Sequence, residues 1–146
     1  MCIRDSYNLV YREEEREMIP LCLDEGVAVL PWSPLARGLL AGNRTREGER
    51  KTERSRTDAF ADSLYLPDVD FAVVDRVAEV AAARGVPPAQ VALAWLLQKP
   101  GVTAPIVGAT KLEHLEDAIA AERLSLAADE IASLEEPYAP HVISGH

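Results

Sequence analysis

Short runs of apolar residues alternate along this chain with segments in which apolar residues recur every three or four positions. The short runs predict buried strands, and the three-to-four spacing predicts amphipathic helices. Gly26 and the Pro100–Gly101 pair end two of the helical segments. We expect strands at residues 7–12 (the exit of a strand), 27–30 and within 102–107, and helices at residues 13–25, 69–85, 89–99, 111–122 and 128–135.

The alternation of strands with helices predicts a parallel sheet joined by right-handed crossovers. The helix at 89–99 is apolar on most sides, so it is expected to be buried, and the helix at 69–85 aligns Val73, Val77 and Val80 on one face. About three strands are present, and a parallel sheet needs both faces covered and its edges protected. The pattern therefore favours a piece of a larger α/β fold.

Composition narrows the classes of partner. The chain has 146 residues and a net charge of −9, which argues against a nucleic-acid binder or a protein that adheres to acidic membranes. No apolar run approaches the ~20 residues that a membrane helix needs, and no secretory signal is visible. The two cysteines make a disulfide framework or a zinc site a poor expectation. We expect a cytoplasmic protein with neither a nucleic-acid nor a membrane partner and without a metal site.

The first six residues, M-C-I-R-D-S, resemble a translated sequencing adapter. We therefore expect residues 1–6 to be non-native and set them aside from fold reasoning. On that interpretation, residues 7–146 are the C-terminal portion of a longer protein that is incomplete at its N-terminus.

Two segments have the character of binding sites. Residues 27–40 read V-A-V-L-P-W-S-P-L-A-R-G-L-L, a short strand that runs into a proline- and glycine-rich loop. Residues 106–117 read I-V-G-A-T-K-L-E-H-L-E-D, a strand followed by a glycine and a helix start, where backbone N–H groups attract anions. Alternatively, Thr110 and Glu113 form a capping box at the start of this helix, and Lys111 is an ordinary surface lysine.

Together these segments resemble the aldo-keto reductases. The resemblance covers nearly all of residues 7–146 and includes Y-N-L, E-E-E-R-E-M-I-P, S-P-L-A-R-G, P-A-Q-V-A-L-A-W-L-L, P-I-V-G-A-T and P-Y-x-P-H. It implies the C-terminal part of a (β/α)8 TIM barrel, with parallel strands and flanking helices. Trp32 and Gly108 are then expected at the C-terminal ends of neighbouring strands, where such barrels build their active sites. Arg4 departs from the family, which usually has glutamine at that position.

The resemblance also implies a site for NADPH. Trp32 matches the aromatic residue that stacks on the nicotinamide ring; alternatively, it is a core tryptophan. His114 stands where arginine or glutamine is usual, and Ala118 stands where asparagine commonly contacts adenine. A preference for NADPH would therefore rest mainly on Lys111. The residues that match the pyrophosphate loop are Ser33, Leu35, Arg37 and Gly38; those that match the 2′-phosphate and adenine site are Gly108, Thr110, Lys111, His114 and Asp117.

The family's four catalytic residues, an aspartate, a tyrosine, a lysine and a histidine, come from the first half of the barrel and have no match in this chain. We therefore expect the full-length parent to reduce aldehydes or ketones with NADPH, and the chain alone to be inactive. One alternative is a cofactor-sensing regulatory subunit like the potassium-channel beta subunits. Another is a different (β/α)8 enzyme with a phosphate-binding last loop. The polar segment 41–67, with its basic cluster, is either a solvated loop or a flap over the site.

Overall fold

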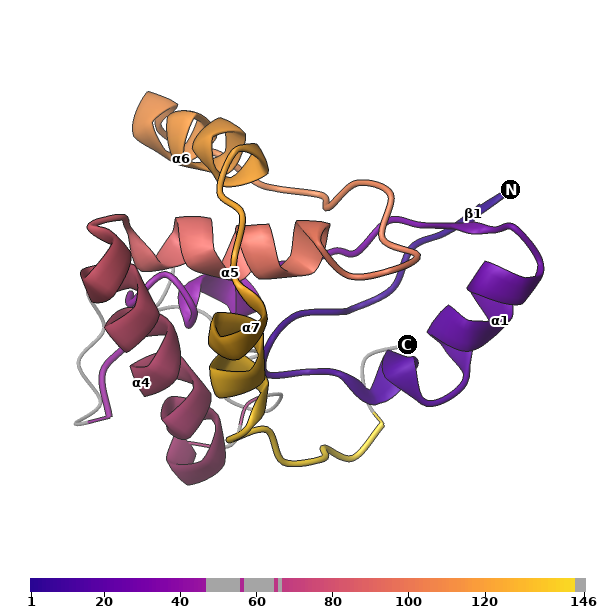
Figure 1. The fold of residues 1–146 in the computed structure, drawn as a ribbon, viewed down its shortest axis with the longest axis horizontal. Coiled ribbons are helices and arrows are strands. Elements are labelled where there is room, and N and C mark those ends of the chain that lie inside the picture. The colour runs from indigo at the N-terminus through magenta and orange to yellow at the C-terminus, as the bar shows by residue number, and fades with distance from the viewer. Residues whose placement is uncertain (47–55, 57–64, 66, 144–146) are drawn as a thin grey trace.

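The computed structural model describes residues 1–46, 56, 65 and 67–143. Its ribbon shows helices packed around a narrow set of parallel extended segments (Figure 1). The elements, in chain order, are β1 (Cys2–Ile3), the 3-10 helix η1 (Glu13–Glu15), α1 (Met18–Asp24), β2 (Ala28–Val29), the 3-10 helix η2 (Ala36–Gly38), α4 (Pro67–Arg84), α5 (Pro88–Leu97), α6 (Leu112–Glu122) and α7 (Ala128–Glu135).

Three extended segments run side by side in the same direction. β1 pairs with β2 in parallel, and the pairing continues as a bridge between Ser6 and Trp32. On its other edge, β2 forms a parallel bridge from Val29 to Val102. The Ile106 N–H then donates to the Pro31 carbonyl at 2.7 Å. The predicted parallel arrangement is therefore confirmed, with the β2 segment in the middle.

Two strand predictions need correction. The first paired strand lies within residues 2–6, whereas residues 8–11 form a tight turn in which Asn8 and Tyr11 exchange two backbone hydrogen bonds of 3.1 Å. The third segment, predicted within 102–107, makes one bridge and scattered bonds rather than a regular strand. Pro105 contributes to this because it has no N–H to donate to a ladder. The register does not bear on the origin of residues 1–6, which stays a prediction.

The helix predicted at 13–25 is in fact two short helices, η1 and α1. Pro20 explains the division, since its ring clashes with the carbonyl four residues earlier and it has no N–H to donate. α1 begins at Met18, which places Pro20 in the first turn, where proline is tolerated. The other predicted helices agree with α4, α5, α6 and α7 to within about two residues, the ordinary uncertainty of helix ends.

α5 lies at the centre of the helical layer. It contacts α4 on one side and α6 on the other, and α4 also contacts α7 (Figure 1). All six residues from Val91 to Leu96 are buried, which confirms the expectation for this helix. The predicted face of α4 is confirmed as well, because Val73, Val77 and Val80 are buried. These side chains form one continuous hydrophobic cluster with Trp95 and Leu134.

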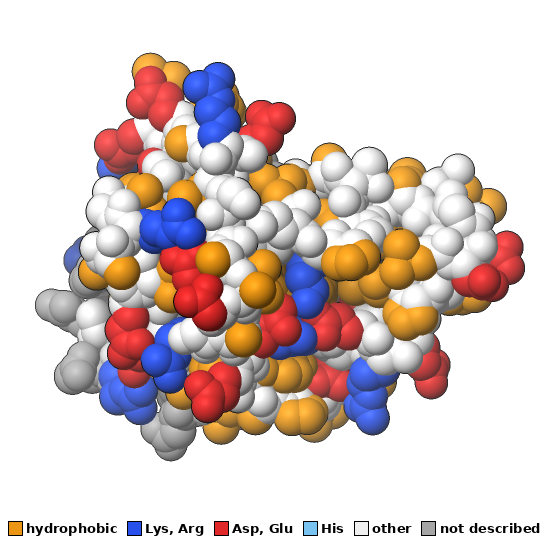
Figure 2. All heavy atoms as spheres, viewed as in Figure 1, with side chains coloured by type: hydrophobic (Ala, Val, Ile, Leu, Met, Phe, Trp, Pro, Cys, Tyr) orange, Lys and Arg blue, Asp and Glu red, His pale blue; other side chains and the backbone are white. Residues whose placement is uncertain are grey.

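α6 also carries an apolar face at helical spacing, but that face is exposed. Leu112, Leu115 and Ile119 share that face but are 71%, 44% and 52% exposed. Leu21 and Leu23 of α1 are also more than half exposed, and hydrophobic side chains gather on the arm of the molecule that carries α1 (Figure 2). Helical spacing thus shows which side of a helix is apolar, but it does not show whether other described residues bury that side.

Among the described residues, no single helix has the length and apolar character to cross a membrane. Residues 69–84 and α5 meet that criterion only when taken together across a bend of 102°.

The buried face of α7 provides a test of this core. Leu134 is 0% exposed, whereas Ile119 of α6 is 52% exposed. We predict that Leu134→Ala lowers the free energy of unfolding by about 2–5 kcal/mol, because it leaves a cavity among packed side chains. Ile119→Ala should change it by about 0.5 kcal/mol or less. Denaturant titration followed by circular dichroism measures both, and similar losses would contradict the assignment of the core.

Candidate functional site

The two segments singled out in the sequence meet at one end of the parallel segments. The Trp32 N–H donates to the Asp5 carbonyl at 2.8 Å, and the residue before it, Pro31, accepts the 2.7 Å hydrogen bond from Ile106. Gly108 follows Ile106 by two residues. Trp32 and Gly108 therefore lie beyond the C-terminal ends of neighbouring parallel segments, as predicted.

The loop after Trp32 has an unusual backbone. Ser33, Ala36 and Arg37 all have left-handed φ values, 51°, 48° and 55°, which are costly for residues with a Cβ. Gly38 also has a positive φ of 94°, and a Cβ there would lie 2.9 Å from the Asn43 amide nitrogen, so this position requires glycine. Within this loop, Leu35 (φ −103°, ψ 19°) followed by the left-handed Ala36 is the right-then-left pairing in which successive N–H groups can face one anion.

Two short hydrogen bonds close the turns of this loop. The Ala36 N–H donates to the Ser33 carbonyl, and the Gly38 N–H donates to the Leu35 carbonyl, both at 2.9 Å. Within the described residues, the N–H groups of Ser33 and Leu35 donate to no backbone carbonyl. Those two donors are available to a ligand.

Asn8 holds the start of this loop, and sequence reasoning gave it no role. Its side chain is 0% exposed, and its amide nitrogen donates to the Ser33 carbonyl at 3.0 Å. Its amide oxygen accepts from the N–H groups of Val10 and Tyr11, each at 3.0 Å. The sequence feature that includes Asn8 is the Y-N-L motif, which indicated the family but not the hydrogen bond to Ser33.

The second segment departs from the predicted helix start. α6 begins at Leu112, its N-cap residue is Lys111, and no side chain caps it. The prediction that Thr110 caps this helix is therefore wrong, because Thr110 precedes the N-cap residue. The Lys111 ammonium lies 3.3 Å from Glu113, with both side chains about two-thirds exposed. Gly108 has open space where a Cβ would stand, so the chain reversal does not require glycine there.

The remaining predicted residues of this segment lie on α6. His114 is exposed in the first turn. Asp117 is half-buried, and its carboxylate accepts a 2.7 Å hydrogen bond from the Gln90 amide of α5. Asp117 therefore already joins two helices, and any contact with adenine would use its remaining acceptor capacity.

Part of the basic loop can be placed. Arg46 forms a 2.7 Å ion pair with Asp75 of α4, and its guanidinium lies 5.7 Å from the centre of the Phe71 ring. Arg50, Lys51 and Arg54 lie outside the described residues. The flap interpretation stays a prediction.

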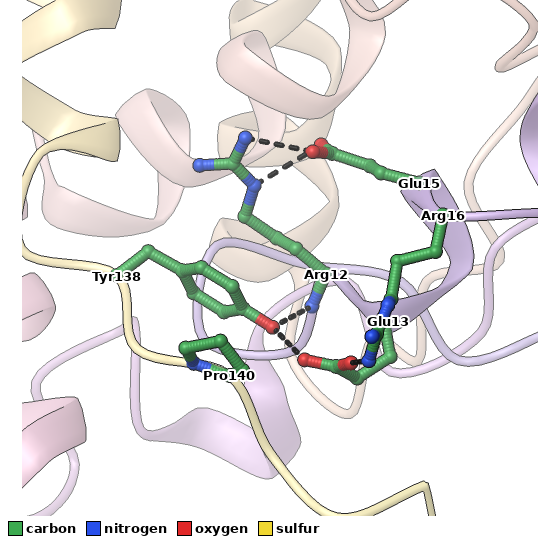
Figure 3. A pocket seen from close by; sticks show the side chains of 6 residues that line it. All are labelled: Arg12, Glu13, Glu15, Arg16, Tyr138 and Pro140. Atoms are coloured by element: carbon green, nitrogen blue, oxygen red, sulfur yellow. Dashed lines mark hydrogen bonds and ion pairs between the residues drawn. The ribbon is translucent and has the colours of Figure 1, made fainter.

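A separate pocket of about 340 Å³ lies where the C-terminal tail crosses the turn that contains η1 (Figure 3). The Tyr138 hydroxyl donates to Glu13 at 2.6 Å and accepts from the Arg12 backbone N–H at 3.1 Å. None of the residues predicted to bind the cofactor lines this pocket, and its two arginines are offset by two glutamates. Its lining residues are Arg12, Glu13, Glu15, Arg16, Tyr138 and Pro140.

Beside this pocket, a network of charges joins η1 to the helical layer. The Arg12 guanidinium forms a fork with the Glu15 carboxylate at 3.0 and 2.7 Å. Glu135 of α7 accepts from the Trp95 indole and the Lys99 ammonium, each at 2.8 Å. Burial raises the pKa of both glutamates, but the hydrogen bonds from these donors outweigh it and hold each pKa below its usual value. The network is therefore charged at neutral pH.

His141 fastens the tail to α4. Its Nε2 lies 3.0 Å from an Asp70 carboxylate oxygen, and the two side chains are 4% and 2% exposed. Its backbone N–H donates to Glu13 at 2.9 Å, and its ring stacks on that of Tyr138. The hydrogen bond to Asp70 raises the pKa of His141 above its ordinary value and outweighs the effect of burial.

Within the described part of the chain, no three His, Cys, Asp or Glu side chains are grouped to hold a metal ion.

Comparison with known proteins assigns the family. The model of the Aldo/keto reductase family matches residues 1–139. The chain belongs to the aldo-keto reductase family. The resemblance seen in the motifs is thereby confirmed.

Curated aldo-keto reductases and a solved structure share this similarity. Versiconal hemiacetal acetate reductase of Aspergillus parasiticus is 44% identical over 144 residues, covering 97% of this chain and 41% of that protein. An aldo-keto reductase of Metarhizium robertsii is 45% identical over 147 residues, covering 99% of this chain and 38% of that protein. The chain thus spans about two fifths of the length of these relatives. A thermostable aldo-keto reductase crystallised with the inhibitor epalrestat superposes with a TM-score of 0.65 and 28% identity, over 93% of this chain and 39% of that one.

The His141–Asp70 pair makes stability depend on pH. Because the pKa of His141 is raised in the folded state, the contribution of this pair is fully present below the ordinary histidine pKa near 6.5. It is lost as pH rises through the raised value. We predict that Asp70→Asn lowers the free energy of unfolding by about 1.5–3 kcal/mol at about pH 6, and by less at about pH 9.

The other charged groups near His141 are Glu13 and its partner Arg16. Asp75→Asn is a matched control on the same helix, because its pair with Arg46 is exposed. Thermal unfolding of the three proteins across this pH range measures the effect. A constant difference between wild type and Asp70→Asn would contradict the assignment.

Proposed function

We propose that this chain is the NADPH-binding part of an aldo-keto reductase whose complete (β/α)8 barrel reduces aldehydes or ketones to alcohols. The observation that carries the proposal is the hydrogen bond from Ile106 to Pro31, which sets the two candidate segments side by side. Active sites of parallel barrels lie at the C-terminal ends of the strands, and both segments leave the sheet there. The family membership of the chain supports the same assignment.

The loop after Trp32 suits the pyrophosphate and nicotinamide. The loop offers the backbone donors of Ser33 and Leu35, the cationic side chain of Arg37 and the Cβ-free Gly38, a set of groups that suits a diphosphate. The half-buried Trp32 stands at the base of this loop, where its ring can stack on a flat heterocycle. A bound NADPH would supply the hydride for carbonyl reduction.

The start of α6 suits the 2′-phosphate of the adenosine. No side chain caps this helix, so the N–H groups of Leu112 and Glu113 remain available, whereas that of His114 donates to the Lys111 carbonyl at 3.2 Å. Lys111 adds a positive charge at the N-cap position. To reach a phosphate, the Lys111 ammonium would leave its present contact with Glu113. Gly108 and Thr110 line the approach, and His114 and Asp117 lie on the following turns of the helix.

This chain's part in the reaction is to bind and orient. The family's four catalytic residues have no match in it, so the proton that a carbonyl oxygen accepts on reduction must come from the part of the barrel that this chain does not include. The substrate class that we propose is a small aldehyde or ketone.

Selectivity for the 2′-phosphate provides the first test. We predict that Lys111→Glu weakens NADPH binding by about tenfold and leaves NADH nearly unchanged, because only NADPH carries the phosphate. His114→Arg should tighten NADPH, since it replaces an imidazole with a permanent charge. Titration of both cofactors, followed by the fluorescence of the two tryptophans, Trp32 and Trp95, measures these changes.

Arg123→Glu is the matched control, because Arg123 is exposed at the opposite end of α6. It should leave the ratio of the two affinities unchanged. Equal losses of NADH and NADPH in Lys111→Glu would show that the lysine does not recognise the phosphate.

Catalysis provides the second test. We predict that the 146-residue chain alone shows no carbonyl-dependent oxidation of NADPH. A hybrid in which residues 7–146 replace the matching segment of versiconal hemiacetal acetate reductase should regain it, because that protein supplies the rest of a barrel. Absorbance at the NADPH band measures both. A folded hybrid that binds NADPH but reduces no carbonyl substrate would contradict the proposed reaction.

A further inference from the structure

The loop at residues 33–38 adopts a conformation that its own residues do not favour. Three of its residues have a Cβ and a left-handed φ, a region that such residues rarely occupy without support from their surroundings. An element outside the loop must therefore hold its shape. Ser33, the first residue of the loop, accepts a side-chain hydrogen bond from Asn8.

Asn8 is itself fixed on every polar atom. Its amide oxygen accepts from Val10 and Tyr11, its backbone exchanges two hydrogen bonds with Tyr11, and no part of it is exposed. With the oxygen committed to two N–H donors, the amide nitrogen must point toward the Ser33 carbonyl. The direction of this donor is therefore set before any ligand binds.

The Ser33 carbonyl receives two donors. One is the Asn8 amide nitrogen at 3.0 Å, and the other is the Ala36 N–H at 2.9 Å, which closes the first turn of the loop. Together they fix the peptide plane that follows Ser33, and with it the orientation of the turn. Loss of the Asn8 bond would leave Ser33 free to return to a more favourable φ.

We propose that Asn8 is a positioning residue for the pyrophosphate loop, holding Ser33 in its left-handed conformation so that the loop's N–H groups face a pyrophosphate. This proposal rests on the proposed function. It assigns Asn8 no contact with the cofactor. It therefore predicts a loss confined to ligands that carry a pyrophosphate.

Two ligands test the pyrophosphate loop and the 2′-phosphate site separately. ADP-ribose carries the pyrophosphate without the 2′-phosphate, and adenosine 2′,5′-bisphosphate carries the 2′-phosphate without a pyrophosphate. In the 146-residue chain, Asn8→Asp keeps the acceptor for Val10 and Tyr11 and removes the donor to Ser33. It also adds a buried negative charge, which the Ser33→Gly rescue described below leaves unchanged. Isothermal titration should show that it weakens ADP-ribose binding by about tenfold and changes bisphosphate binding by about twofold or less.

Two further variants keep the test sharp. If circular dichroism shows that Asn8→Asp fails to fold, Asn8→Ser serves instead, because its hydroxyl accepts from nearby N–H groups but does not reach Ser33. Tyr138→Phe is the matched control: it removes two hydrogen bonds to Arg12 and Glu13, just after this turn, without touching Ser33. It should leave both affinities unchanged.

Rescue tests the physical cause. Glycine occupies the left-handed region without cost, so adding Ser33→Gly to Asn8→Asp should restore part of the ADP-ribose affinity relative to Asn8→Asp alone. Equal losses of both ligands, or no loss of ADP-ribose, would overturn the role of Asn8, as would unfolding of both Asn8 variants. A wild-type chain that binds neither ligand would instead overturn the proposed function.

Discussion

The pairing of the β2 segment on both of its edges is the constraint on which the rest of the structure depends. Backbone bonds to the β1 side and to residues 102–106 fix three segments in one direction. Their common end is where the loop after Trp32 and the approach to α6 emerge. The local sequence of each loop cannot bring the two together, because the two segments are about seventy residues apart in the sequence.

Local features of the sequence predicted a large part of the fold. Helical spacing located α4 and α6, and a run that is apolar on most sides located α5, whereas glycine or proline lies at or near an end of α4, α5 and α7. The order of elements predicted the parallel pairing. Pro20 was visible in the sequence as a limit on the first helix, although the division into η1 and α1 became clear only from the structure. The residues of the two candidate segments were found from their motifs, and their roles toward a cofactor stay predictions.

Contacts between distant residues could not be predicted in the same way. The bond from Asn8 to Ser33 spans 25 positions, and the pair of His141 with Asp70 spans 71. No periodicity or motif relates residues at such separations, because the contacts arise only when the helices have packed. The predicted cap of α6 was wrong for a different reason. Thr110 and Glu113 match the spacing of a capping box, but the N-cap residue of the helix is Lys111, one residue after Thr110.

The tail also bears on how the chain folds as it is synthesised. Glu13 is a buried carboxylate whose partners include Tyr138 and the His141 backbone, more than a hundred positions later. A growing chain emerges N-terminus first, so Glu13 lacks these partners until residues 138–141 have been synthesised. Contacts of such long sequence separation close late, since the loop between them must be ordered first. The segment around Glu13 is therefore among the last parts of this structure to be completed.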